Sequence, residues 1–202
     1  MRNSIEHVVL LKIRDDALRT QIEEMMIAVK SLTKISGVLQ VSTGGGLSSG
    51  DNESCTFLDS SSCHGFNHVL CVHLESKEAL RVYQDHEYHI KIRDDFIKPL
   101  LSGPPIAVDW VSSSQIGTRD SNAVQHLTLV KRGNNFEGID GGDAIFVEEW
   151  MSDRTRGYKS ARRIKFDSIE ALGRWYKSME QARDSDDTSG GDSMFQIAWC
   201  EY

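Results

Sequence analysis

The sequence predicts an α+β protein made of two related ferredoxin-like halves, of which the second is reduced. The first observation is an internal repeat: residues 5–12 reappear as 124–131, and 65–80 reappear as 157–172. The second is the order of apolar patterns within the first copy. The third is a glycine-rich stretch where the second copy should carry its first helix. We therefore expect a first domain at 1–111, a linker at 112–122 and a degenerate second domain at 123–202.

The first half is predicted to run strand, helix, strand, strand, helix, strand. Leu18, Ile22, Met25 and Val29 recur at helical spacing, which predicts an amphipathic helix over about 17–35. Gly37 is expected to end that helix and Ser76 to cap the next one. The remaining predicted elements are strands at 5–13, 38–43, 66–75 and 106–110, and a helix running from 77 towards 100. The triplet at 44–46 is expected to begin a flexible connection.

The second half keeps the strand patterns but loses the first helix. Residues 132–143 hold four glycines and no apolar period, a composition that does not support a long helix. We expect one face of that sheet to lack a covering helix. Residues more polar than their first-half counterparts are expected to compensate on it, among them Thr128, Arg162, Arg163 and Lys165.

Composition narrows the classes of function. The chain has 30 acidic against 23 basic residues, a net charge of −7, and no long basic stripe, so nucleic-acid binding is not supported. The basic run at 154–163 is expected to be a solvated strand and turn. Four cysteines lack metal-site spacing; Cys55 and Cys63 could form a disulfide if oxidised, but free thiols are expected. No apolar run approaches the ~20 residues of a membrane span, and the N-terminus lacks a signal-peptide core, so a cytoplasmic location is expected.

Two tyrosines and two histidines at 83–89 form the candidate chemical site. Histidine and tyrosine side chains exchange protons or bind a carbonyl near neutral pH. His7, on the first strand, is either a hydrogen-bonded core residue or a part of this site. Tyr83 and His89 lie about 240° apart on an ideal helix, so they converge only if the helix breaks. His86 and His89 could share a metal, but no third ligand accompanies them, and no metal site is predicted.

Four short segments of the first half resemble those of a known protein family. The first half resembles the stress-responsive dimeric alpha/beta barrel family in His7-Val-Val-Leu-Leu-Lys12, Gly65-Phe-Asn-His68, Ser76-Lys-Glu-Ala-Leu80 and His86-Glu-Tyr-His89. The resemblance implies that two sheets meet to close a barrel, here as an intramolecular pseudo-dimer, with a further homodimer left open. Strands that are apolar at adjacent positions, such as Val8 and Val9, agree with burial on both faces.

By resemblance to polyketide cyclases of this family, His89 would be the general base and Tyr83 would hold a carbonyl. His7, His68, His86, Val9 and Val29 would line the ligand site. The family's usual proline and pocket tyrosine are replaced here by Glu87 and Val29. No cofactor is expected beyond a structural magnesium ion that the resemblance allows after the first helix.

Two functions follow from this reading of the sequence. The first is a stress-response protein that binds a small hydrophobic or phenolic ligand in the N-terminal half. The alternative is a cyclase-like enzyme that closes a ring by aldol chemistry through His89 and Tyr83. The two departures favour binding. In the second copy Trp175, Ser178 and Gln181 stand where the first has Tyr83, His86 and His89, so that half is expected to be a structural partner.

Overall fold

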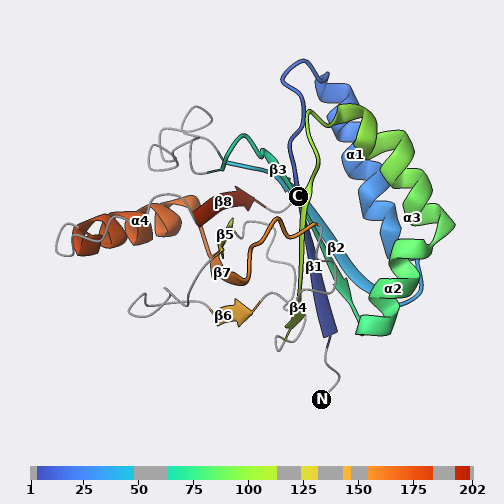
Figure 1. The fold of residues 1–202 in the computed structure, drawn as a ribbon. Coiled ribbons are helices and arrows are strands. Elements are labelled where there is room, and N and C mark those ends of the chain that lie inside the picture. Colours follow the sequence, from blue (N-terminus) through green and yellow to red (C-terminus); the bar gives the residue numbers. More distant parts are fainter. Residues whose placement is uncertain are drawn as a thin grey trace.

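A computed structural model describes residues 4–47, 63–112, 124–131, 143–146, 154–183 and 194–200. It contains two four-stranded antiparallel sheets, with strand orders β2-β3-β1-β4 and β6-β7-β5-β8 (Figure 1). The predicted α+β class with two ferredoxin-like halves is confirmed.

The bounds of the elements are as follows. The first half has β1 Ser4–Leu11, α1 Arg19–Lys30, a 3₁₀ turn Ser31–Lys34, β2 Val38–Gly45, β3 His68–Leu74, α2 Lys77–Asp85, α3 Glu87–Ile92, a π-helical segment Arg93–Ile97, a 3₁₀ turn Lys98–Leu100 and β4 Ile106–Ser112. The second half has β5 Val124–Val130, β6 Asp143–Phe146, β7 Ser160–Phe166, α4 Ile169–Arg183 and β8 Met194–Cys200.

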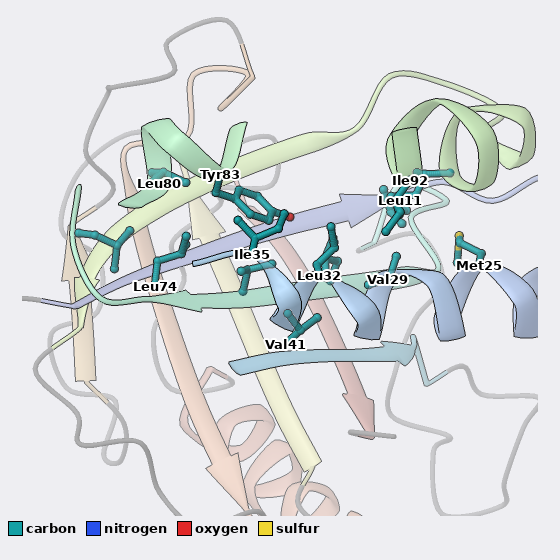
Figure 2. Packing of buried hydrophobic residues seen from close by; sticks show 14 of the residues in the cluster. Leu11, Met25, Val29, Leu32, Ile35, Val41, Leu74, Leu80, Tyr83 and Ile92 are labelled. Carbon is teal, nitrogen blue, oxygen red and sulfur yellow. The ribbon is translucent and has the colours of Figure 1, made fainter. Parts of the chain in front are cut away.

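Helices α1, α2 and α3 cover one face of the first sheet (Figure 1). Two local signals place them as predicted. The Ser76 hydroxyl accepts a hydrogen bond from the Ala79 amide at 3.1 Å and starts α2. Gly37, with φ +84°, follows the turn after α1, and a Cβ there would lie 2.7 Å from the Ala79 Cβ. The layer between helices and sheet is apolar and includes Met25, Val29, Leu32, Leu74 and Tyr83 (Figure 2).

The predicted continuous helix from 77 towards 100 is wrong. Helix α2 ends at Asp85, and His86 takes an extended conformation with ψ 128°. The His86 ring then caps α3, because its Nδ1 accepts a hydrogen bond from the Tyr88 amide at 3.1 Å. A side chain that competes for the main-chain donors of the next turn ends a helix without proline or glycine.

The two sheets pack face to face. Inward residues of both form one buried cluster, which the first sheet supplies through Val8, Leu10, Val69, Val108 and Trp110 and the second through Leu127, Leu129, Ala161, Phe195, Ile197 and Trp199. The two central strands, β1 and β3, thus bury one face against helices and the other against a sheet, as the resemblance implied.

The glycine triplet at 44–46 is not a flexible connection. Strand β2 continues through Gly45, and Gly46 pairs with Trp199 of β8. The Leu47 amide donates to the Ala198 carbonyl at 2.8 Å. A Cβ on Gly44 would lie 2.1 Å from the Cys200 carbonyl oxygen. Glycine is therefore needed because the main chains of the two halves approach each other along this seam.

The outer face of the second sheet is covered by α4, which lies on the side away from the first sheet (Figure 1). Thr128 and Arg162 face each other there, both buried. Arg163 and Lys165 were expected on the same face, but their register partners are Leu127 and Gln125, so they point towards the first sheet. The expected loss of a helix concerns 132–142, which lie outside the described residues.

Within the described parts of the chain, Cys63, Cys71 and Cys200 are free thiols. No helix there is long and apolar enough to cross a membrane. No group of three or more histidine, cysteine, aspartate or glutamate side chains is arranged to hold a metal ion among these residues.

Candidate functional site

A buried histidine–aspartate pair forms the floor of the candidate site. The register of β1 and β4 sets His7 opposite Asp109, and both side chains are almost inaccessible to solvent. The His7 Nδ1 lies 2.6 Å from Asp109 Oδ1. Since a carboxylate only accepts, Nδ1 is the protonated nitrogen, and the pair is a charge-assisted hydrogen bond.

Tyr83 and His89 stand over this pair from the two helices that meet at His86. The His89 ring lies 4.4 Å from the Tyr83 ring, and the Tyr83 ring lies 6.0 Å from that of His7, measured between centroids. The helix break turns what would be opposite faces into one direction. The predicted convergence of Tyr83, His89 and His7 is therefore present in the geometry.

Burial favours the neutral forms of Tyr83 and His89. Desolvation raises the pKa of Tyr83 above the usual range of a phenol. For His89, desolvation lowers the pKa to about 4, partly opposed by a hydrogen bond to the Gln84 carbonyl and reinforced by the nearby His7. The His89 Nδ1 lies 3.1 Å from the Gln84 oxygen and donates to it, which leaves Nε2 as a neutral acceptor near pH 7.

Two buried oxygens of the site lack hydrogen-bond partners among the described residues. They are the Tyr83 hydroxyl and Asp109 Oδ2. A buried polar group left without a partner costs about 1–3 kcal/mol. Their position beside two imidazoles gives the site a donor and an acceptor for a bound polar atom.

The other predicted site residues separate into two groups. Val9 and Val29 belong to the apolar cluster that includes Tyr83, so they lie in the same layer as the site. His68 is paired with Leu11, four positions along β3 from the partner of His7, and hydrogen-bonds to Asn67 at 3.1 Å. Burial lowers the pKa of His68. His68 is the first residue of β3, whereas His7 lies near the middle of β1.

His86 faces outwards. It is exposed and borders an open hollow of about 660 Å³ on the outer side of the α2–α3 junction, lined also by Glu78, Arg81, Val82, Asp85 and Glu87. The structure therefore gives His86 the role of positioning α3, and through it His89, without bringing its ring to Tyr83.

Asp109 is the site residue that the sequence analysis missed. The available signal was a single acid within the otherwise apolar strand 106–110, on the strand that neighbours that of His7. A buried carboxylate in an apolar strand requires a partner, and a histidine at a matching register position can supply it.

The histidine of the second half that is equivalent to His7 is enclosed by other aromatic side chains. His126 is fully buried, and its Nε2 lies 2.6 Å from the Tyr176 hydroxyl. Its register partner on β8 is Ala198 where the first half has Asp109. The Trp175 ring lies 4.9 Å from it. Desolvation, with a smaller contribution from Arg162, lowers the pKa of His126 to about 3.

The magnesium ion that the resemblance allows stays a prediction. In the last turn of α1 the main-chain oxygens of Ala28 and Lys30 accept hydrogen bonds from the hydroxyls of Ser31 and Thr33, at 2.5 and 3.0 Å. The function proposed below does not involve a metal.

Comparison with known proteins decides the family. The family model for the Stress responsive A/B Barrel Domain matches residues 5–112. The chain belongs to this family. It is similar to a stress-response A/B barrel domain-containing protein of Arabidopsis thaliana, with 33% identity over 129 residues, 63% of this chain and 44% of that protein. The match therefore spans less than half the length of this relative.

A second curated relative from the same plant is also a stress-response A/B barrel domain-containing protein, with 28% identity over 69% of this chain and 70% of that protein. The solved structure of a Fusobacterium nucleatum protein covers 98% of this chain and 92% of its own at a TM-score of 0.57 and 9% identity. At that identity the likeness concerns the fold alone, and it includes both halves.

Proposed function

We propose that the N-terminal half binds one small, largely apolar molecule that carries a phenolic hydroxyl or a carbonyl. The site lies between the first sheet and helices α1 to α3. The observation that carries the proposal is the pair of buried oxygens on Tyr83 and Asp109, which lack partners among the described residues, beside His7 and His89.

A ligand of this kind would satisfy the site chemically. Its hydroxyl could donate to Asp109 Oδ2 or His89 Nε2, while its carbonyl could accept from the Tyr83 hydroxyl. Its apolar body would contact Val9, Val29 and their neighbours, where burial contributes about 25 cal/mol per Å². Val9 and His89 are only partly buried, which supports access along that side.

A second function has one observation in its favour. The Tyr83 and His89 rings lie close enough to act on one substrate, with His89 Nε2 as base and Tyr83 as donor to the carbonyl, as in an aldol-type ring closure. A general base is most effective when its pKa is near the working pH, and that of His89 is lowered to about 4. Binding is therefore the better-supported function.

Isothermal titration with 2,4-dihydroxyacetophenone tests the proposal, because this probe carries both groups on one ring. We expect binding to the wild-type chain and at least tenfold weaker binding of acetophenone, which lacks the hydroxyls. Equal affinity for the two compounds would contradict the proposed polar contacts.

Variants locate the binding site. Tyr83→Phe and His89→Ala should each weaken binding about tenfold, since each removes a hydrogen bond worth about 1 kcal/mol or more. The matched control is His86→Asn, which keeps an acceptor for the α3 cap and lies on the outer side. If His86→Asn weakens binding as much as His89→Ala, the site is at the outer hollow and the proposal is wrong.

A further inference from the structure

A partly buried ion pair joins the two halves of the barrel. Arg163 on β7 forms two hydrogen bonds with the carboxylate of Glu6 on β1, of which Nη2 to Oε1 measures 2.8 Å. The Glu6 side chain is 3% exposed and that of Arg163 is 25% exposed. Such a two-point contact fixes both the charge and the orientation of its partners.

The Arg163 guanidinium also approaches two further side chains of the first half. Besides Glu6, its Nη1 lies 3.9 Å from the Cys71 sulfur, and its central carbon lies 5.9 Å from the centre of the Trp110 ring. The cation of the second sheet thus enters a site formed by three strands of the first sheet.

The internal repeat shows which residues would meet if two N-terminal sheets, or two C-terminal sheets, packed against each other. Under the repeat, Gln125 takes the place of Glu6, and Cys71 takes the place of Arg163. The two registers agree, because Cys71 pairs with Val8 while Arg163 pairs with Leu127. Two N-terminal sheets packed in the same way would set Glu6 against a cysteine, and two C-terminal sheets would set Arg163 against a glutamine.

We infer that the Glu6–Arg163 pair selects the partner of the N-terminal sheet: it accepts the C-terminal sheet and rejects the N-terminal sheet of a second copy. A pairing of two first sheets would bury two Glu6 carboxylates without the Arg163 guanidinium, leaving each beside the neighbouring imidazole of His73 on the same sheet. An uncompensated buried charge is far more costly than a paired one. Because only an unlike pair is charge-matched, each barrel contains one N-terminal and one C-terminal sheet, and therefore a single His7–Asp109 site.

Charge reversal in the full-length chain tests whether the two residues act as a pair. Glu6→Arg and Arg163→Glu should each lower Tm by about 5 °C or more, since each places like charges in the buried contact. The double variant should recover most of that loss. The matched control reverses Lys91 and Asp95, an exposed ion pair with Nζ 2.8 Å from Oδ2, which should change Tm by no more than about 2 °C.

Mixing tests selection directly. The two single variants are unfolded together in urea, refolded, and examined by light scattering. Each N-terminal sheet then finds a matched partner only in the other chain, so we expect an exchanged dimer of twice the 22.7 kDa chain mass, formed in the mixture and not by either variant alone. Wild-type stability in both single variants would overturn the pairing. Refolding of the mixture to the same species as the separate variants would overturn the selection.

Discussion

The two halves of this protein place a histidine at the same point of the same sheet and surround it with different groups. His7 has a carboxylate on one ring nitrogen, and the rings of Tyr83 and His89 above it. His126 has a tyrosine hydroxyl on the other nitrogen, and Trp175 packs over its ring. The first arrangement holds an ionisable pair below a phenol and a second imidazole, whereas the second encloses a neutral histidine.

The difference shows that two copies of one fold can keep the same sheet packing and still differ in the residues on their outer faces. The strands and their register are retained in both copies, because each sheet must cover the other. The residues on the outer faces are not needed for that contact and have diverged. Under the repeat, Ala198 stands at the position of Asp109, and Trp175 stands at the position of Tyr83. This contrast agrees with the proposal that the second sheet serves as the partner surface and the first carries the candidate site.

The largest expected effect is the dependence of stability on pH. The unfolded chain protonates His126 near pH 6.5, whereas the folded chain does so only near pH 3, so protons favour unfolding throughout that interval. The stability that the neutral His126 contributes is therefore fully present above about pH 6.5 and decreases as the pH falls towards 3. At 1.36 kcal/mol per pH unit, His126 alone should account for about 3 kcal/mol between pH 6.5 and 4.

Urea unfolding of His126→Gln at pH 7 and pH 4.5 checks this value. The variant should lose less stability on acidification than the wild-type chain does. His89→Gln should reduce the pH dependence by a smaller amount, because the His89 ring is less buried and its pKa is lowered only to about 4. If His89→Gln reduced the pH dependence of stability more than His126→Gln, the expected order of the two histidines would be wrong.

The next effect concerns the seam that joins the halves. Gly44→Ala should destabilise the chain by about 1–3 kcal/mol, because its Cβ would meet the Cys200 carbonyl oxygen and the main chains would have to separate. Gly103→Ala is the matched control, since nothing lies within 4 Å of a Cβ there. Thermal unfolding of both variants measures the difference. Equal Tm values would mean that β2 and β8 do not approach as described.

A substitution at Asp109 makes the first half resemble the second. Asp109→Asn should cost about 2 kcal/mol, because the charged hydrogen bond to His7 becomes a neutral one in a buried place. It should also weaken binding of the phenolic probe. Chemical denaturation and titration on the same sample would separate the two effects. Full stability together with full binding would remove Asp109 from the site.

The smallest expected effect compares two tyrosine hydroxyls. Tyr176→Phe leaves His126 Nε2 buried without its partner and should cost about 1 kcal/mol or slightly more. Tyr83→Phe removes a hydroxyl that has no partner among the described residues, so stability should stay the same or rise slightly. Paired urea titrations measure both. A greater loss in Tyr83→Phe would show that its hydroxyl is already satisfied.

Much of the fold could be predicted because its signals are local. The apolar spacing of α1, the Ser76 cap and the turn at Gly37 each depend on a few neighbouring residues. The internal repeat then indicated that a second sheet would follow the same order. These patterns fix strand order and layers, since few topologies satisfy them.

The features that were missed depend on contacts between distant segments. No glycine or proline marks the break at His86, and Gly44 is explained only by β8, which lies far along the chain. Arg163 was interpreted as surface charge because its neighbours are basic, yet adjacent strand residues point to opposite faces. The role of Asp109 becomes evident only from the pairing of β1 with β4, which sets Asp109 opposite His7.

The most direct test of the unequal halves is the number of ligand molecules bound per chain. Titration calorimetry with 2,4-dihydroxyacetophenone should give one site, which is weakened in His89→Ala and unchanged in Tyr176→Phe. Two equivalent sites per chain, or one site that responds to Tyr176→Phe and not to His89→Ala, would contradict the assignment of binding to the N-terminal half.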